Sequence, residues 1–239
     1  MKKQSIVTDS LRPARGALGP HVTGPLEGAS FRMGAARRDQ LPPAGAREIA
    51  FAGRSNAGKS SAINALARQT RLAFASRTPG RTQQINFFEL RNGAVVADLP
   101  GYGYAAVPHA LKQGWQELLW SYVTTRDTLI GLVLVVDARH GPRHQDMDVL
   151  AAFLPSGRPA LVLTTKVDKL NQSERRAAIS SIGAQLRETF AERAAATTVI
   201  PFSATLPEGV DAANAILARW LGGSDTRVDS LDPAGAHGH

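Results

Sequence analysis

Short apolar segments alternate with longer segments of helical periodicity through most of the chain. The apolar segments are rich in aliphatic residues and predict strands at residues 48–52, 85–90, 94–98, 129–136, 160–164 and 197–201. Apolar residues at three- and four-residue spacing predict a helix after the first strand and further helices at residues 108–123, 144–154, 173–190 and 208–220. Such alternation is typical of a doubly wound α/β sheet, in which ligands bind at the carboxyl ends of the strands.

One pair of strands is expected to depart from this parallel arrangement. The Asn92-Gly93 dipeptide is a strong signal for a tight hairpin turn, so the strands on either side of it should run antiparallel. The pattern therefore predicts about six strands in a mostly parallel sheet, with one antiparallel edge and helices on both faces.

The two ends of the chain lack this alternation. Residues 1–45 are dominated by Pro, Gly, Ala and Arg, which predicts a flexible basic arm with a short helix around residues 31–38. From Gly222 onward the residues are small and polar, as in a disordered tail. We therefore expect an arm at residues 1–30, one folded domain at residues 31–221 and a tail at residues 222–239.

The segment that follows the first expected strand matches the pattern G-x-x-x-x-G-K-[ST], from Gly53 to Ser60. Its glycines let the backbone curl, so that successive N–H groups point at the α and β phosphates of a nucleotide. Lys59 is expected to reach the β and γ phosphates, and the Ser60 hydroxyl to bind Mg²⁺. This loop at the end of a strand predicts the P-loop NTPase fold class.

A second motif, Asp98-Leu99-Pro100-Gly101, stands at the end of a later apolar strand. There the Asp98 carboxylate can hold a water on Mg²⁺, and the Gly101 N–H can meet the γ-phosphate. Alone, such a segment is often only a turn. Its place after a phosphate-binding pattern favours the nucleotide role.

A third motif, Thr165-Lys166-Val167-Asp168, has the form [NT]-K-x-D and follows another expected strand. Asp168 can accept hydrogen bonds from guanine N1–H and from the guanine 2-amino group, whereas adenine has neither donor there. Guanine is therefore expected to be strongly preferred, with the Lys166 stem along the purine plane. A backbone N–H from Ser203-Ala204 can meet guanine O6.

Composition and charge narrow the classes of function. The chain has no cysteine, which excludes a disulfide framework, a thiolate metal site and a cysteine nucleophile. No apolar run approaches the roughly 20 residues that span a bilayer, so a soluble protein is expected. The net charge of +8 and the pI of about 10.4, with basic excess in residues 1–47 and 68–91, favour a polyanionic partner such as RNA.

Several segments together resemble one family. They are G-R-S-N-A-G-K-S-S at residues 53–61, T-P-G-R-T-Q at 78–83, I-N-F-F at 85–88 and D-L-P-G-Y-G-Y-A at 98–105. Over about residues 30–220 the chain closely resembles EngB-type GTP-binding proteins, the YihA or YsxC group within the Era-like (TrmE-Era-EngA-EngB-Septin-like) GTPases. The resemblance implies a cytoplasmic GTPase in assembly of the large ribosomal subunit, with ribosomal RNA and proteins as partners and a described need in cell division and septation. We expect a monomer with no membrane contact.

The resemblance also implies roles for particular residues. Thr82 would join Ser60 on Mg²⁺ when GTP is bound. Tyr102 occupies the position where many GTPases carry a water-orienting glutamine, so intrinsic hydrolysis should be slow and accelerated by a partner or a cation. Asn56 matches the asparagine that helps to hold K⁺ in related GTPases. For Thr82 and Asn56, an ordinary turn residue is the alternative.

Lys59, Thr82, Gly101 and Asn56 are the residues expected to act in hydrolysis. The residues expected to bind GTP and Mg²⁺ are Gly53, Arg54, Ser55, Asn56, Ala57, Gly58, Lys59, Ser60, Ser61, Gly80, Arg81, Thr82, Asp98, Leu99, Pro100, Gly101, Thr165, Lys166, Asp168, Phe202, Ser203 and Ala204.

Two other readings stay open at this point: a P-loop ATPase or kinase, and an RNA-binding module with a vestigial nucleotide site. His140 and His144 lie four residues apart, as zinc ligands can, but no third ligand accompanies them, so solvated loop histidines are expected.

Overall fold

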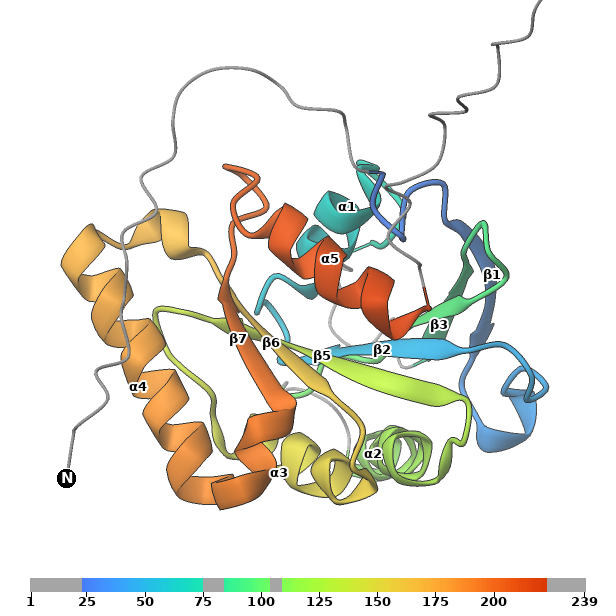
Figure 1. The fold of residues 1–239 in the computed structure, drawn as a ribbon. Helices are drawn as coiled ribbons and strands as arrows, with labels where there is room; N and C mark the ends of the chain where they lie inside the picture. Colours follow the sequence, from blue (N-terminus) through green and yellow to red (C-terminus); the bar gives the residue numbers. More distant parts are fainter. Residues whose placement is uncertain (1–22, 75–83, 104–108, 223–239) are drawn as a thin grey trace, which may run out of the picture.

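The structure, a computed structural model, describes residues 23–74, 84–103 and 109–222 (Figure 1). Within these residues the strands are β1 (Ser30–Ala35), β2 (Glu48–Gly53), β3 (Ile85–Glu89), β4 (Val95–Asp98), β5 (Leu129–Asp137), β6 (Ala160–Thr165) and β7 (Thr197–Pro201). The α-helices in the same ranges are α1 (Lys59–Ala67), α2 (His109–Thr125), α3 (His144–Phe153), α4 (Gln172–Phe190) and α5 (Val210–Trp220).

The strands form one sheet in the order β1-β3-β4-β2-β5-β6-β7. Neighbours from β4 through β7 pair in parallel, whereas β3 is antiparallel to both β4 and β1. The predicted fold class, a mostly parallel doubly wound sheet, is confirmed. Within the described residues the sheet has seven strands, one more than expected.

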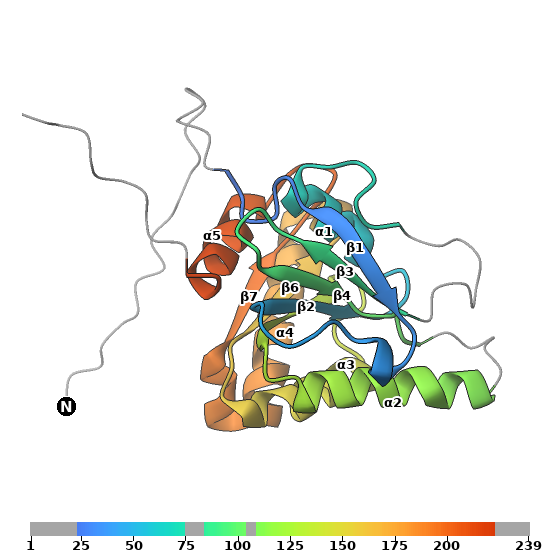
Figure 2. The same ribbon diagram turned by 90° about the vertical axis from the view of Figure 1, so that its right-hand side faces the viewer.

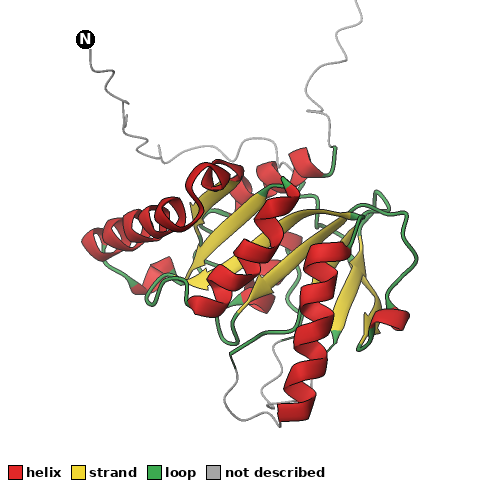
Figure 3. Cartoon of the chain, turned by 90° about the horizontal axis from the view of Figure 1, so that it is seen from below, coloured by secondary structure: helices red, strands yellow, loops and turns green. Residues whose placement is uncertain are grey.

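Helices cover both faces of the sheet, so the molecule has three layers. Helices α1 and α5 pack on one face, and α2, α3 and α4 pack on the other, the face seen from below in Figure 3. The side chains of the central strand β2 contribute alternately to the hydrophobic cores on the two faces of the sheet. Ile49 and Phe51 enter the core under α1 and α5, whereas Ala50 and Ala52 enter the opposite core, because successive strand residues point to opposite faces.

The expectation of a short helix around residues 31–38 is wrong. Residues 30–35 form β1, which pairs with β3 at the edge of the sheet, and only a 3-10 turn follows it, at Arg38–Gln40 (Figure 2). The Phe31 ring packs edge-on against Phe88, with ring centroids 6.0 Å apart. The strand conformation of residues 30–35, whose own periodicity is weak, is therefore determined by pairing with β3, which lies far away in the sequence.

The arrangement brings the carboxyl ends of β2, β4, β5 and β6 to one edge of the sheet. The motifs singled out in the sequence follow these ends, so chemistry from distant parts of the chain gathers there. No helix in the described ranges is long and apolar enough to cross a membrane. The division into arm, folded domain and tail stays a prediction.

Candidate functional site

Residues 53–60, the phosphate loop, leave the end of β2 and turn directly into α1. Gly58 has a φ of 95° and Asn56 a φ of 63°, so the loop uses left-handed backbone at two points. A Cβ on Gly53 would lie 2.7 Å from the carbonyl oxygen of Val135 on β5. Because glycine has no Cβ, the backbone at the start of the loop can lie close to the neighbouring strand β5.

The Lys59 ammonium group forms an ion pair with the Asp98 carboxylate at the end of β4. Both side chains are largely buried, and Ser60 follows as the second residue of α1. A hydroxyl and a carboxylate next to a phosphate-binding loop are oxygen donors of the kind that Mg²⁺ takes, so the residues present fit that ion.

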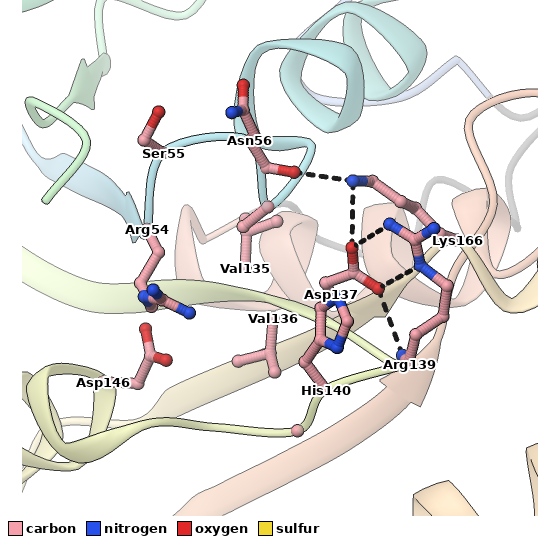
Figure 4. A pocket seen from close by; sticks show the side chains of 12 residues that line it. Arg54, Ser55, Asn56, Val135, Val136, Asp137, Arg139, His140, Asp146 and Lys166 are labelled. Carbon is pink, nitrogen blue, oxygen red and sulfur yellow. Dashed lines mark hydrogen bonds and ion pairs between the residues drawn. The ribbon is translucent and has the colours of Figure 1, made fainter. Parts of the chain in front are cut away.

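The base motif, Thr165-Lys166-Val167-Asp168, is expected to meet the base; it starts at the last residue of β6 and also supports the phosphate loop. The Thr165 hydroxyl donates to the Ala57 carbonyl oxygen at 2.5 Å. The Lys166 ammonium donates to the Asn56 carbonyl oxygen at 2.6 Å, as Figure 4 shows. Lys166 itself has left-handed backbone, with a φ of 61°. The first two residues of the motif thus hold the phosphate loop.

A cavity of about 230 Å³ lies between the phosphate loop and the end of β5 (Figure 4). On its wall Asp137 accepts from the Lys166 ammonium at 2.9 Å and from the Arg139 guanidinium at 2.7 and 2.9 Å. Burial alone would raise the pKa of Asp137, but these hydrogen bonds outweigh it and hold the pKa well below its usual range. Asp137 therefore stays ionised and fixes the Lys166 ammonium.

Sequence reasoning missed both Asp137 and Arg139. The signal for Asp137 was its position at the end of an almost continuous aliphatic run, where a parallel strand delivers its next polar residue to the ligand edge. Arg139 gave no comparable signal, because its role depends on the turn that brings it back onto Asp137.

Asp168 lies in a 3-10 turn after β6 and accepts a hydrogen bond from the Ser203 hydroxyl at 2.8 Å. Its second oxygen lies 3.3 Å from the Lys169 ammonium. The Ser203 hydrogen bond, and then the contact with Lys169, lower the pKa of Asp168, although partial burial opposes them. The carboxylate is thus fixed in place as an acceptor, the form that a guanine edge requires.

The structure shows which of the two backbone N–H groups, that of Ser203 or that of Ala204, is available to donate to guanine O6. The Ser203 N–H donates to the Glu208 carbonyl oxygen at 3.0 Å, so it is already used. Within the described part of the chain the Ala204 N–H donates no hydrogen bond. Of the Ser203-Ala204 pair, Ala204 therefore supplies the available donor.

Two other members of the predicted set have side chains in the core. Phe202 and Leu99 are fully buried, Phe202 under α1 and α5 and Leu99 in the opposite layer. The Phe202 N–H donates to the Thr164 carbonyl oxygen at 2.8 Å, which ties the loop after β7 to β6. These two side chains support the loops that carry the exposed groups, and a contact of their backbone with the nucleotide stays a prediction.

Tyr102, next to the Asp98-x-x-Gly101 segment, is buried among core residues, and its hydroxyl donates to the Asp146 carboxylate at 2.7 Å. Asp146 is a further residue that sequence reasoning missed. A phenol engaged in this way is not free to orient a water molecule.

The remaining predicted residues fall in two groups. Ser61 is exposed at the start of α1, and Pro100 is buried beside Gly101. Gly80, Arg81 and Thr82 lie outside the described residues, so the second Mg²⁺ ligand stays a prediction.

The two histidines give no metal site. The His144 imidazole is exposed and pairs with Asp148 in the next turn of α3 at 2.8 Å. Across residues 23–74, 84–103 and 109–222 no three potential metal-ligating side chains come together.

Two family models match the chain. The model described as a 50S ribosome-binding GTPase matches residues 48–166, and the elongation factor Tu GTP binding domain matches residues 123–222. The first match contains the phosphate loop, the Asp98 segment and the start of the base motif.

Relatives match over nearly the whole chain. The chain is 46% identical over 208 residues to the probable GTP-binding protein EngB of Azoarcus sp. (strain BH72). The aligned residues make up 87% of this chain and 97% of that protein. The chain is 50% identical over 194 residues to the probable GTP-binding protein EngB of Aromatoleum aromaticum, which covers 81% of this chain and 88% of that one.

Solved structures share the fold. A crystal structure of a probable GTP-binding protein EngB covers 73% of this chain and 98% of its own, with a TM-score of 0.58 and 22% identity. The structure of Aquifex aeolicus Era bound to GDP and AlF4⁻ covers 78% of this chain and 59% of its own, with a TM-score of 0.56 and 21% identity.

Proposed function

Because the chain belongs to the EngB family of GTP-binding proteins, we propose that it is a GTPase switch in assembly of the large ribosomal subunit. GTP binding and GTP hydrolysis are activities that the family and both matching models carry. The ribosomal partner is supported by the description of one of these models, a 50S ribosome-binding GTPase, and by the net charge of +8. We place this activity in the cytoplasm, where ribosomes are assembled, and expect the chain to act as a monomer.

One observation supports this function above the others: the base motif and the phosphate loop are built as a single unit. Thr165 and Lys166 hold the phosphate loop through two of its carbonyl oxygens, while Asp168, two residues after Lys166, is fixed by Ser203. A purine whose edge meets Asp168 would therefore have its phosphates directed to the loop that Lys166 supports. Such a coupling of base and phosphate recognition suits a nucleoside triphosphate rather than a phosphate or a base alone.

The reaction is the attack of water on the γ-phosphate of GTP, with GDP and phosphate as products. Lys59 and the N–H groups of the phosphate loop stabilise the charge that develops on the transferring phosphoryl group. The Ser60 hydroxyl and the Asp98 carboxylate, acting through water, are the described residues that would hold Mg²⁺. When bound, that ion neutralises charge on the β and γ phosphates.

We expect slow intrinsic hydrolysis, because the Tyr102 hydroxyl is engaged by Asp146 and supplies no water-orienting group. Asn56 is exposed, and its side chain makes no hydrogen bond within the described residues. In Figure 4 its amide points away from Lys166. We propose that this amide helps to hold K⁺ beside the phosphates, where the cation would accelerate hydrolysis.

GTP hydrolysis measured in potassium and in sodium chloride tests the role of Asn56. Potassium should stimulate hydrolysis by the native protein and not by Asn56→Ala. Equal hydrolysis rates of the native protein in both salts would contradict a role for K⁺.

Sedimentation with ribosomal subunits tests the switch. The protein should travel with the large subunit in the presence of a non-hydrolysable GTP analogue and much less with GDP. Lys59→Ala serves as the control that lacks phosphate binding. Raising the salt concentration should weaken the association steeply, since arginine contacts to RNA phosphates release counterions. Equal sedimentation with both nucleotides, or none with either, would contradict the proposed function.

A further inference from the structure

The segment after Asp98 is fixed to the phosphate loop by its backbone. The Ser55 N–H donates to the Tyr102 carbonyl oxygen at 2.8 Å, and Arg54 and Tyr102 pair as in a parallel bridge. A Cβ on Gly101 would lie 3.4 Å from backbone atoms of Ser55. Gly101 therefore lies so close to the loop expected to bind the phosphates that an added methyl group would already contact it.

The Tyr102 side chain fixes the same segment from the other side. Tyr102 is 3% exposed, and its hydroxyl donates to Oδ1 of Asp146, which is 2% exposed. The other carboxylate oxygen, Oδ2, accepts from the Arg143 N–H at 2.8 Å in the capping box that begins α3. Tyr102 thus joins the segment to the first turn of a helix that starts more than 40 residues later in the chain.

The protonation states suit this connection. Burial is the main cause that raises the pKa of both the Tyr102 phenol and the Asp146 carboxyl group, while the charge of Arg54 favours the ionised carboxylate. The phenol therefore keeps its proton at neutral pH and remains a donor. In Figure 4 the Arg54 side chain extends from the phosphate loop toward Asp146.

We propose that Tyr102 is a positioning residue for GTP: anchored on Asp146, it holds the Gly101 backbone against the phosphate loop before the γ-phosphate arrives. GDP has no γ-phosphate and makes no use of the Gly101 N–H, so the anchor favours GTP over GDP. This role depends on the GTPase activity of the family and not on the ribosomal partner.

The chain contains a matched control for this anchor. Tyr122 and Glu48 are each 1% exposed, and the Tyr122 hydroxyl donates to the Glu48 carboxylate at 2.5 Å. This is the same chemistry, a buried phenol on a buried carboxylate. It lies at the opposite edge of the sheet, because Glu48 begins the strand that Gly53 ends.

The test compares Tyr102→Phe with Tyr122→Phe in the full chain. For each variant, calorimetry gives the affinities for GDP and for a non-hydrolysable GTP analogue, single-turnover kinetics give the hydrolysis rate, and urea titration gives the stability. Both variants should lose stability, because each removes a phenol donor from a buried carboxylate; Tyr122→Phe should lose less, because the Arg126 guanidinium still donates to Glu48. Only Tyr102→Phe should lower the affinity for the GTP analogue, by about tenfold relative to GDP, with a slower hydrolysis step.

Substitutions at Asp146 give a second test of the proposal, which does not depend on Tyr102→Phe being well folded. Asp146→Asn can still bond to both Tyr102 and Arg143, so it should keep most of the preference for the GTP analogue over GDP, whereas Asp146→Ala should lose it. An unchanged ratio of affinities in Tyr102→Phe and Asp146→Ala would overturn the proposal. So would an equal change of that ratio in Tyr122→Phe, which would mark the effect as general destabilisation.

Discussion

Replacing Lys166 with methionine separates the support of the phosphate loop from the recognition of the base. Methionine keeps an unbranched stem of similar length to lie along a purine, but it removes the ammonium group. In the native chain that group donates to the Asn56 carbonyl oxygen at 2.6 Å and to Asp137 at 2.9 Å. The substitution therefore removes one of the two bonds between the base motif and the phosphate loop, and the Thr165 hydroxyl keeps the other.

The size of the effect follows from the two bonds that the Lys166 ammonium group makes. Asp137 keeps the Arg139 guanidinium, so the loss there is partly compensated. The Asn56 carbonyl oxygen accepts from no other protein donor within the described residues, and a charge-assisted hydrogen bond contributes about 1.5–3 kcal/mol. Because the Lys166 side chain is 31% exposed, we take the lower end, about 1.5–2 kcal/mol, which corresponds to a loss of affinity of about 10- to 30-fold.

Calorimetric titration with GTP and with GDP is the assay. Both affinities should fall by the same factor, because both nucleotides use the same loop, and the preference for guanine over adenine should survive. Lys169→Met is the matched control, since that lysine is 62% exposed and contacts Asp168 at only 3.3 Å; its effect should stay below about twofold. A Lys166→Met protein that binds both nucleotides as tightly as the native chain would refute the idea that this side chain supports the loop.

Three further substitutions have defined outcomes. Asp168→Asn exchanges a double acceptor for a group that is half donor, so GTP affinity should fall by about 10³-fold while a xanthine nucleotide gains; unchanged GTP binding by fluorescence titration would remove the guanine assignment. Asp137→Asn should cost about 1–2 kcal/mol at neutral pH, and because the native pKa lies below its ordinary value, this deficit should hold down to about pH 5 and shrink below about pH 4 in urea titrations; a deficit that grows with acid would be contrary to the sign of that shift. Gly53→Ala puts a methyl group 2.7 Å from the Val135 carbonyl oxygen and should destabilise the fold by about 1–3 kcal/mol, whereas Gly157→Ala meets no atom within 4 Å and should cost only backbone strain, a difference that thermal unfolding would detect.

The sequence alone was sufficient for those parts of the site whose chemistry is local. The phosphate loop needs glycines, a lysine and a hydroxyl in consecutive positions, and the base motif needs a carboxylate three residues after a threonine, so both are readable as written. The strands before them were predictable because buried parallel strands are almost continuously apolar. Within the described residues, most of the predicted strands and helices begin and end within a few residues of the expected positions.

Two of the misses, β1 and Asp146, have a different physical cause, which is pairing between residues far apart in the sequence. β1 became a strand because β3 offered an edge to pair with, and its own residues carried only a weak pattern. Asp146 acquires its role from Tyr102, which only the folded chain brings near it, whereas Arg139 pairs with Asp137, two residues away, through a local turn. The use of the Ser203 N–H by Glu208 likewise depends on a turn that no motif announces.

The most direct test of the account is a calorimetric titration of the purified full-length chain with GTP and with ATP in the presence of Mg²⁺. Asp168 is held as an acceptor by Ser203, and we expect it to meet the edge of the base, so GTP should bind at least about 10³-fold more tightly than ATP. Equal affinities for the two nucleotides would contradict the central claim, because a phosphate loop alone cannot tell one purine from the other.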